Sequence, residues 1–260
     1  MHQKKSYRDM EQLLLGSSEI RTALELTDEV PNYATLNRTY KKISSGRWEQ
    51  MSTNLLLAAE DGAGIEAEYV AIDSTYFAPT QASSTFLSKA GRKHSHYFTG
   101  AFAVCVVSLF ILAVCSGTGP GSDVPYLDPL RKKALRFGVQ RPSGRRYQTV
   151  LADRGFDGRT VREGDLIPVI RRGNTIRDPK LIARAELVAQ ARLDGKMGQR
   201  WMVETVNSVI KRKFGENIRS RSQELRIREP IIKALVYNLH RLRALFYLTF
   251  LSPKTALTYA

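Results

Sequence analysis

One stretch of this chain carries acidic and basic side chains at a spacing suited to chemistry on phosphate groups. The segment 197–215, MGQRWMVETVNSVIKRKFG, is predicted to be a helix, in which steps of three and four residues return to the same side. The polar residues that share one side are Arg200, Glu204, Ser208 and Lys211. There Glu204 could bind a metal ion while Arg200 and Lys211 hold a polyanion. The alternative is a solvated helix with ordinary charge pairs.

Two aspartates further upstream favour the metal-binding interpretation. Asp73 follows the apolar run of AEYVAID and Asp153 that of QTVLAD, so each is predicted to end a β-strand. A sheet fixes the direction of its side chains, and a flanking helix can add Glu204 across a cleft. Carboxylates gathered in this way hold two magnesium ions about 4 Å apart, one activating the attacking water or hydroxyl and the other stabilising the leaving oxygen.

The acidic residues of the upstream segments also have structural alternatives. Asp73 opens a Ser-Thr-rich segment and could cap that turn. Asp157 competes with Asp153 within LADRGFDG, although Asp157 is expected to cap a short helix predicted for DGRTVREG. Asp123 follows Gly-Ser at a predicted helix start, so capping is its expected role and support of the metal site its alternative. No His or Cys spacing is typical of a zinc site.

The whole chain is strongly basic. Its 260 residues include 40 Lys and Arg against 25 Asp and Glu, which gives a formal net charge of +15. This excess favours a polyanionic partner, with nucleic acid ahead of an anionic membrane surface. Two basic runs bracket the predicted metal site and indicate a track for a phosphate backbone. The residues of these runs are Lys89, Arg92, Lys93, Lys211, Arg212, Lys213, Arg219 and Arg221.

One apolar segment raises the question of a membrane span. Residues 101–115, AFAVCVVSLFILAVC, are almost wholly apolar but fall short of the roughly 20 residues that a bilayer needs. Their Val, Ile and Phe content favours two buried strands of a hairpin that folds near Val107-Ser108. Both cysteines, Cys105 and Cys115, lie in this segment without companions, which fits a reducing cytosol. The N-terminus lacks the apolar core of a secretory signal.

The remaining pattern predicts a helical N-terminal region followed by an α/β domain. Residues 1–66 have helical spacing, and the segment PNYATLNRTYKKI within them exposes Arg38 and Lys41. Such a polar, basic helix among short helices suggests a helix-turn-helix DNA reader, with a plain helical bundle as the alternative. Residues 67–250 alternate strands and helices around a central mixed sheet, and 251–260 form a tail.

Three motifs resemble, in order and spacing, those of DDE insertion-sequence transposases. They are AIDSTYF, LADRGFDG and RWMVETVNSVIKRKFG. The third is similar to that group's Tyr-x2-Arg-x3-Glu-x6-Lys signature through Arg200, Glu204 and Lys211, with Met197 at the Tyr position. The resemblance extends from about Pro31 to the YNLHRL segment near the end of the chain, and GSDVPYLDPL also resembles a stretch of these proteins.

This resemblance implies a ribonuclease-H-like mixed sheet flanked by helices. It implies that Asp73, Asp153 and Glu204 bind two magnesium ions, or manganese in their place, while Arg200 and Lys211 contact the transposon end. The implied reaction cuts a 3′ end with water and then joins the freed hydroxyl to target DNA. The implied partners are double-stranded DNA, with terminal inverted repeats and a target site, and a second copy of the chain.

Other classes of function stay open at this point. A nuclease of the same fold would cut DNA without joining it, and a catalytically silent relative would bind DNA and repress its element. A small membrane protein is supported only by residues 98–119. With no membrane partner expected, the chain is predicted to act in the prokaryotic cytoplasm, associated with the nucleoid.

Overall fold

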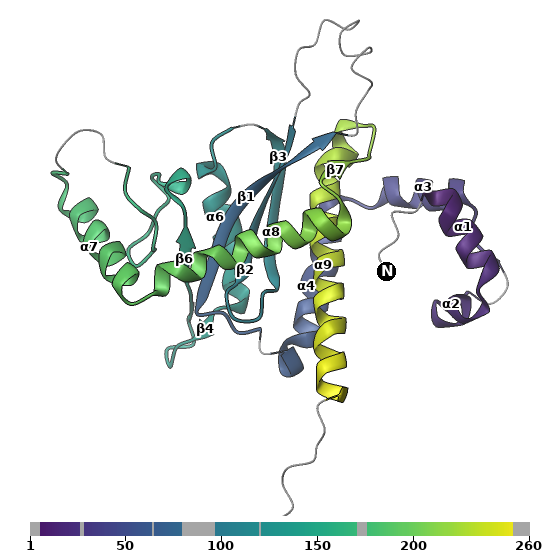
Figure 1. The fold of residues 1–260 in the computed structure, drawn as a ribbon, viewed down its shortest axis with the longest axis horizontal. Helices are drawn as coiled ribbons and strands as arrows, with labels where there is room; N and C mark the ends of the chain where they lie inside the picture. Colours follow the sequence, from purple (N-terminus) through teal and green to yellow (C-terminus); the bar gives the residue numbers. More distant parts are fainter. Residues whose placement is uncertain are drawn as a thin grey trace, which may run out of the picture. The chain divides into compact units, whose positions relative to one another are not determined.

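The structure is a computed structural model that describes residues 6–26, 29–63, 65–79, 97–119, 121–170 and 176–251 (Figure 1). Two compact units, Met1–Trp48 and Glu49–Ala260, divide the chain. The α-helices are α1 Tyr7–Gly16, α2 Ser18–Ala23, α3 Tyr33–Lys42, α4 Ser45–Ala63, α6 Val124–Ala134, α7 Pro179–Leu193, α8 Trp201–Phe214 and α9 Gln223–Leu251. Short 3-10 helices are η1 Leu135–Phe137, η2 Arg154–Phe156 and η3 Lys196–Arg200. The strands are β1 Tyr69–Pro79, β2 Tyr97–Cys105, β3 Ile111–Gly119, β4 Val139–Gln140, β5 Arg146–Tyr147, β6 Thr149–Ala152 and β7 Asn217–Ile218.

Three short helices, α1 to α3, make up most of the first unit. Asn32 begins α3 as expected, because its side-chain oxygen accepts the backbone N–H of Thr35 at 2.9 Å. Arg38 and Lys41 on this helix are exposed. The segment 24–32 separates α2 from α3 and is longer than the three- or four-residue turn of a compact helix-turn-helix. DNA reading by this unit therefore stays a prediction.

The second unit is built on a mixed sheet in the order β3-β2-β1-β6, with β7 also paired to β1. β1 is antiparallel to β2 and parallel to β6, with Ile72 opposite Ala152 in the last parallel pair. A single parallel bridge between Leu151 and Leu166 continues the order beyond β6. This arrangement confirms the α/β class with a mixed sheet flanked by helices, and it is consistent with the ribonuclease-H-like fold.

The apolar segment folds as the hairpin that its composition predicts. β2 and β3 pair from Tyr97↔Gly119 inward, and the turn between them leaves Val107 81% exposed. Leu109 adopts a φ of 60°, which lets the chain reverse without the usual Gly or Asn. Within the described residues, none of the helices has the length and apolarity that crossing a bilayer requires.

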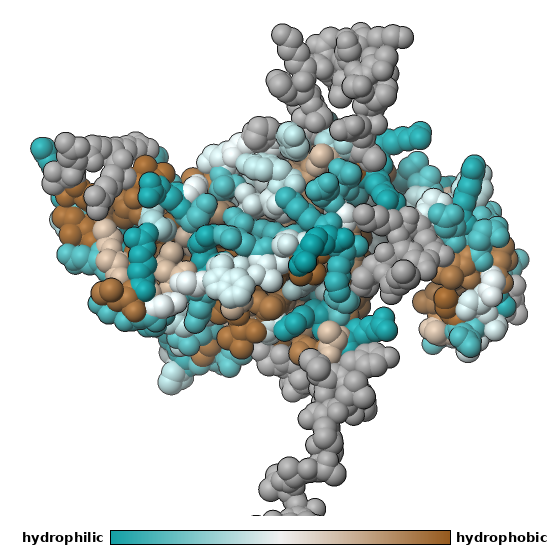
Figure 2. Space-filling model, viewed as in Figure 1, coloured by the Kyte–Doolittle hydropathy of each residue, from teal (hydrophilic) through white to brown (hydrophobic). Residues whose placement is uncertain are grey.

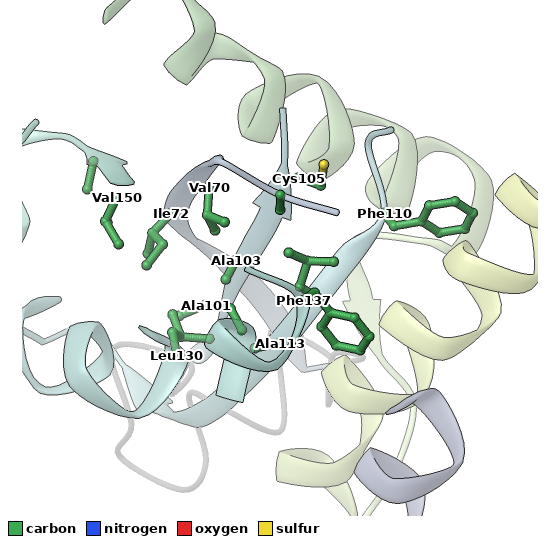
Figure 3. Packing of buried hydrophobic residues seen from close by; sticks show 14 of the residues in the cluster. Val70, Ile72, Ala101, Ala103, Cys105, Phe110, Ala113, Leu130, Phe137 and Val150 are labelled. Atoms are coloured by element: carbon green, nitrogen blue, oxygen red, sulfur yellow. The ribbon is translucent and has the colours of Figure 1, made fainter. Parts of the chain in front are cut away.

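A continuous apolar core fills the space between the sheet and α6. Alternate residues of a strand face the same side, so Val70 and Ile72 of β1 meet Val150 of β6 there, against Leu130 of α6 (Figure 3). Phe137, from η1, completes this layer. The same alternation sends Asp73 to the opposite side of the sheet.

The opposite side of the sheet is covered by α8 and the first half of α9. Gly100 on β2 is closely packed, because a Cβ there would lie 2.9 Å from Phe77, 3.0 Å from Phe102 and 3.1 Å from Pro230. Lys233 of α9 is buried and lies over the ring of Phe77, 5.2 Å from its centre. Its Nζ also donates hydrogen bonds to backbone carbonyls at the end of α8, which joins the two helices to one another and to the sheet.

Polar contacts hold α9 against β3. The fully buried Asn238 pairs with Ile111, its Oδ1 accepting the backbone N–H and its Nδ2 donating to the backbone C=O, both at 2.9 Å. Its Nδ2 also reaches Ser52 of α4. A buried amide that satisfies both of its groups in this way fixes the register of a helix against a strand.

Two ion pairs, one buried and one partly buried, secure the connections around β6. Arg131 of α6 pairs with Asp165, and both side chains are almost inaccessible to solvent. Arg184 of α7 pairs with Asp157 at 2.5 Å, and the other oxygen of Asp157 accepts the backbone N–H of Ile170. The expectation that Asp157 caps a helix was therefore wrong. The segment DGRTVREG forms turns, and the Asp157 side chain pairs with Arg184 of α7.

Candidate active site

Asp73 lies in the middle of β1 rather than at its end. The expected strand end was wrong because β1 continues to Pro79 and stays paired with β2 as far as Phe77↔Phe98. What ends at this position is the neighbouring strand, since β6 pairs with β1 only up to Ile72↔Ala152. Asp73 therefore still lies where one side of β1 loses its partner strand.

Asp153 directly follows β6, as expected. It comes one residue after Ala152, just as Asp73 comes one residue after Ile72, so the two aspartates follow the last pair of the parallel β1–β6 ladder at equivalent positions. The side chain of Asp153 also accepts the backbone N–H of Gly155 at 2.7 Å and so caps η2. This bond holds the carboxylate at the C-terminal end of β6, where open α/β sheets place their ligand sites.

Glu204 lies in the first turn of α8, which crosses the sheet on the side of Asp73 (Figure 1). Arg200 and Glu204 share one face of this segment, since Arg200 donates to Oε1 of Glu204 at 2.5 Å. The Glu204 side chain is 52% exposed. Val206 and Ile210 of the same helix are fully buried, whereas Trp201 is 54% exposed.

A hydrogen bond ties α8 directly to β1 at the candidate site. The Nδ2 of Asn207 donates to Oδ2 of Asp73 at 2.9 Å. Asn207 is three residues after Glu204, so both lie on neighbouring turns of the same helix. Sequence reasoning missed Asn207, because an amide within VNSVI has no local pattern that separates it from an ordinary helix residue.

The charges of the candidate site act on one another. Burial raises the pKa of Asp73 from 3.8 to about 6, and the backbone N–H of Ser74 opposes that shift. The carboxylates of Asp153 and Glu204 raise the same pKa further, whereas the guanidinium of Arg200 lowers it. Asp73 thus lies within electrostatic reach of both other carboxylates and of the guanidinium of Arg200. A carboxyl group with a strongly raised pKa in a partly enclosed place is typical of functional sites.

The donor chemistry of these residues fits a hard divalent cation, because all three offer carboxylate oxygens. Among the described residues, however, no three Asp, Glu, His or Cys side chains lie close enough together to hold an ion. The carboxylate of Glu204 is instead paired with Arg200, four residues earlier in the chain. Coordination by all three carboxylates would require Glu204 to exchange this partner.

Asp123 contacts Ser74, the residue next to Asp73, and its side chain does not cap α6. Its side chain makes no capping bond at the start of that helix, and its Oδ1 instead accepts the hydroxyl of Ser74 at 2.5 Å. A Cβ on Gly155 would lie 3.0 Å from Oδ1 of Asp153 and 3.2 Å from Oδ2 of Asp123. The two carboxylates therefore flank the same glycine, which favours the supporting role over the expected cap.

The predicted basic residues are dispersed over several elements. Lys211 is half-buried near the end of α8, and the exposed Lys213 contacts Nε2 of His240 at 2.6 Å. Hydrophilic side chains cover much of the surface along α8, whereas hydrophobic ones gather over α7 (Figure 2). Arg92 and Lys93 lie outside the described residues, and Arg38 and Lys41 belong to the first unit.

Comparison with known proteins gives one match. Residues 66–239 match a family model described as "Transposase DDE domain", a range that contains β1, β6 and α8 with their three acidic residues. No curated protein matches the chain. No solved structure matches it.

Proposed function

The chain belongs to the transposase DDE domain family, and from this premise we propose that it cuts DNA at the ends of a transposable element and transfers the freed strand to target DNA. The observation that carries the proposal is the equivalent placement of Asp73 and Asp153 on adjacent parallel strands, under a helix that carries Glu204. Acidic side chains at that place suit metal-dependent phosphoryl transfer.

In this proposal Asp73, Asp153 and Glu204 hold two magnesium ions, or manganese in their place. When bound, the ions supply an activated water or 3′ hydroxyl and stabilise the leaving oxygen. Arg200 and Lys211 hold the phosphate backbone beside the carboxylates. A DNA phosphate competes with Glu204 for Arg200, and this exchange turns the Glu204 carboxylate toward the aspartates. Bidentate binding of phosphate by a guanidinium makes Arg200 suited to such an exchange.

The proposed partners are double-stranded DNA and a second copy of the chain. Terminal inverted repeats and the target site occupy the basic surface around α8, which includes Lys213, and the proposed track also takes in Arg92 and Lys93. Residues 1–66 supply further DNA contacts through Arg38 and Lys41, while 67–250 form the catalytic domain and 251–260 a tail. The net charge of +15 supports a polyanionic partner. The nucleoid of a prokaryotic cytoplasm is the proposed place of action.

A second candidate is a catalytically silent DNA-binding protein that represses its own element. The specific observation in its favour is the Arg200–Glu204 ion pair, which occupies the third carboxylate. The position of Met197, where the family signature has tyrosine, points the same way.

Incubation with DNA and magnesium separates these functions. The substrate is a short duplex taken from the DNA that flanks this reading frame, and the products are nicked and joined strands. Cleavage and joining are expected from the unaltered chain, whereas Glu204→Gln should bind the duplex and leave it intact. Binding without nicking by the unaltered chain would favour the repressor, and nicking without joining would favour a nuclease. Undiminished cleavage by the Glu204 variant would overturn the assignment of that residue.

A further inference from the structure

Asn207 is a buried polar side chain that contacts the candidate site. The residue is 6% exposed on the inner side of α8. Its Nδ2 has one partner, Oδ2 of Asp73 at 2.9 Å, while its Oδ1 is buried without a hydrogen-bond partner among the described residues. The amide is thus satisfied on the side that faces Asp73 and unsatisfied on the other.

Such a half-satisfied amide is a poor choice for packing alone. Leaving a buried acceptor without a partner destabilises the folded state, and an apolar side chain of similar volume avoids that cost. The neighbouring inward positions of α8 follow the apolar rule, since Val203, Val206 and Ile210 are fully buried. Asn238 shows how this chain places an amide for purely structural purposes, with both of its polar groups bonded to β3. The unpaired oxygen at Asn207 therefore calls for a different explanation.

The geometry of the helix connects Asn207 to Glu204. Residues three apart lie on neighbouring turns of one face, about 5–6 Å apart between their Cβ atoms. A bond from Asn207 to Asp73 therefore fixes the distance of the Glu204 backbone from β1. It also restricts the rotamer of the Asp73 carboxylate, whose remaining lone pairs can accept another ligand. The Oδ1 of Asn207, which has no hydrogen-bond partner among the described residues, can accept a hydrogen bond from a buried water molecule.

We propose that Asn207 is a positioning residue for the metal-binding carboxylates: it orients Asp73 and sets α8, with Glu204, at the distance from β1 that lets both side chains reach one cation. This inference rests on the proposed function, because it assumes that the carboxylates bind metal. Partners that orient a ligand typically contribute 10- to 100-fold to metal affinity. Asn207 itself need not touch the ion or the DNA.

The test measures Mn²⁺ affinity of the full chain without DNA, by electron paramagnetic resonance of the free ion during titration. Asn207→Leu, which removes the donor at similar volume, should weaken Mn²⁺ binding at least about tenfold. Asn207→Gln, which keeps an amide donor, should recover part of that loss. Asn238→Ala is the matched control, because it removes a buried amide far from the site and should lower thermal stability without changing the affinity of the folded chain. In DNA cleavage, the Mn²⁺ concentration at half-maximal rate should shift for Asn207→Leu by the same factor.

The outcomes are distinct. Weaker binding by Asn207→Leu with unchanged binding by Asn238→Ala supports the positioning role. Unaltered Mn²⁺ affinity in Asn207→Leu overturns the inference and leaves the proposed function standing. An equal loss of affinity in both variants also overturns it, because the effect would then follow from general destabilisation. If the unaltered chain binds no Mn²⁺ and cuts no DNA, the proposed function fails and the inference fails with it.

Discussion

Removing the charge of Asp73 is expected to stabilise the metal-free protein at neutral pH. Burial raises the pKa of this carboxyl group from 3.8 to about 6, so the folded chain holds its proton to a higher pH than the unfolded chain does. Folding stability therefore falls as the pH rises from about 4 to about 6, and the full cost persists above that range. A pKa raised by about two units lowers the free energy of unfolding by about 3 kcal/mol once the group is ionised.

Asp73→Asn should consequently raise the free energy of unfolding by about 3 kcal/mol at pH 8 and by under about 1 kcal/mol at pH 4. Asparagine keeps an oxygen that can accept the Asn207 hydrogen bond, so the change removes charge more than contact. Urea denaturation followed by circular dichroism, with a chelator present, measures the difference at each pH. Glu163→Gln is the control, because this carboxylate lies on an exposed turn and its loss should leave stability unchanged.

Magnesium provides the second arm of the same experiment. A cation that binds the folded site stabilises the unaltered chain by mass action, so the advantage of Asp73→Asn should shrink when the chelator is replaced by excess magnesium. A variant that is no more stable than the unaltered chain at pH 8 would refute the reasoning about burial. A gain of the same size at pH 4 and pH 8 would refute it too, since that gain could not come from ionisation.

Two further predictions concern the C-terminal end of α8. Lys233→Met should lower the free energy of unfolding by about 2–4 kcal/mol in urea, because Nζ of Lys233 donates to the backbone carbonyls of Phe214, Gly215 and Asn217, which would lose this donor. A loss under about 1 kcal/mol would argue against this cap. Lys211→Ala should weaken DNA binding for all sequences alike and reduce the slope of log affinity against log salt by about one. An unchanged slope in a filter-binding or anisotropy titration would exclude a phosphate contact at Lys211.

Local sequence patterns predicted those features that depend on local chain chemistry. The hairpin of β2 and β3 followed from an apolar run too short for a membrane, and Asp153 followed from the end of a short apolar strand. Asp73 was harder to place, because Ser74 and Thr75 suggest a turn. Pairing with β2 keeps Ser74 and Thr75 in an extended strand, so β1 continues past these polar residues.

The supporting contacts of the site could not be predicted from local pattern. Asn207 and Asp73 are 134 positions apart, and Ser74 and Asp123 are 49 apart. Neither pair follows a helical or strand period, and their side chains meet only because the sheet and its flanking helices bring them together. Asp157 shows the reverse error, in which a residue typical of a helix cap is used in a distant ion pair with Arg184.

The two enclosed ion pairs around β6 have a practical consequence for work in concentrated electrolyte. Arg131–Asp165 and Arg184–Asp157 are largely shielded from mobile counterions, whose screening acts mainly on charges at the surface. The loops that follow Asp153 should keep their shape at ionic strengths that strip a duplex from the protein. A wash at high salt concentration can thus release bound nucleic acid from the purified chain without altering the segments that position Asp153.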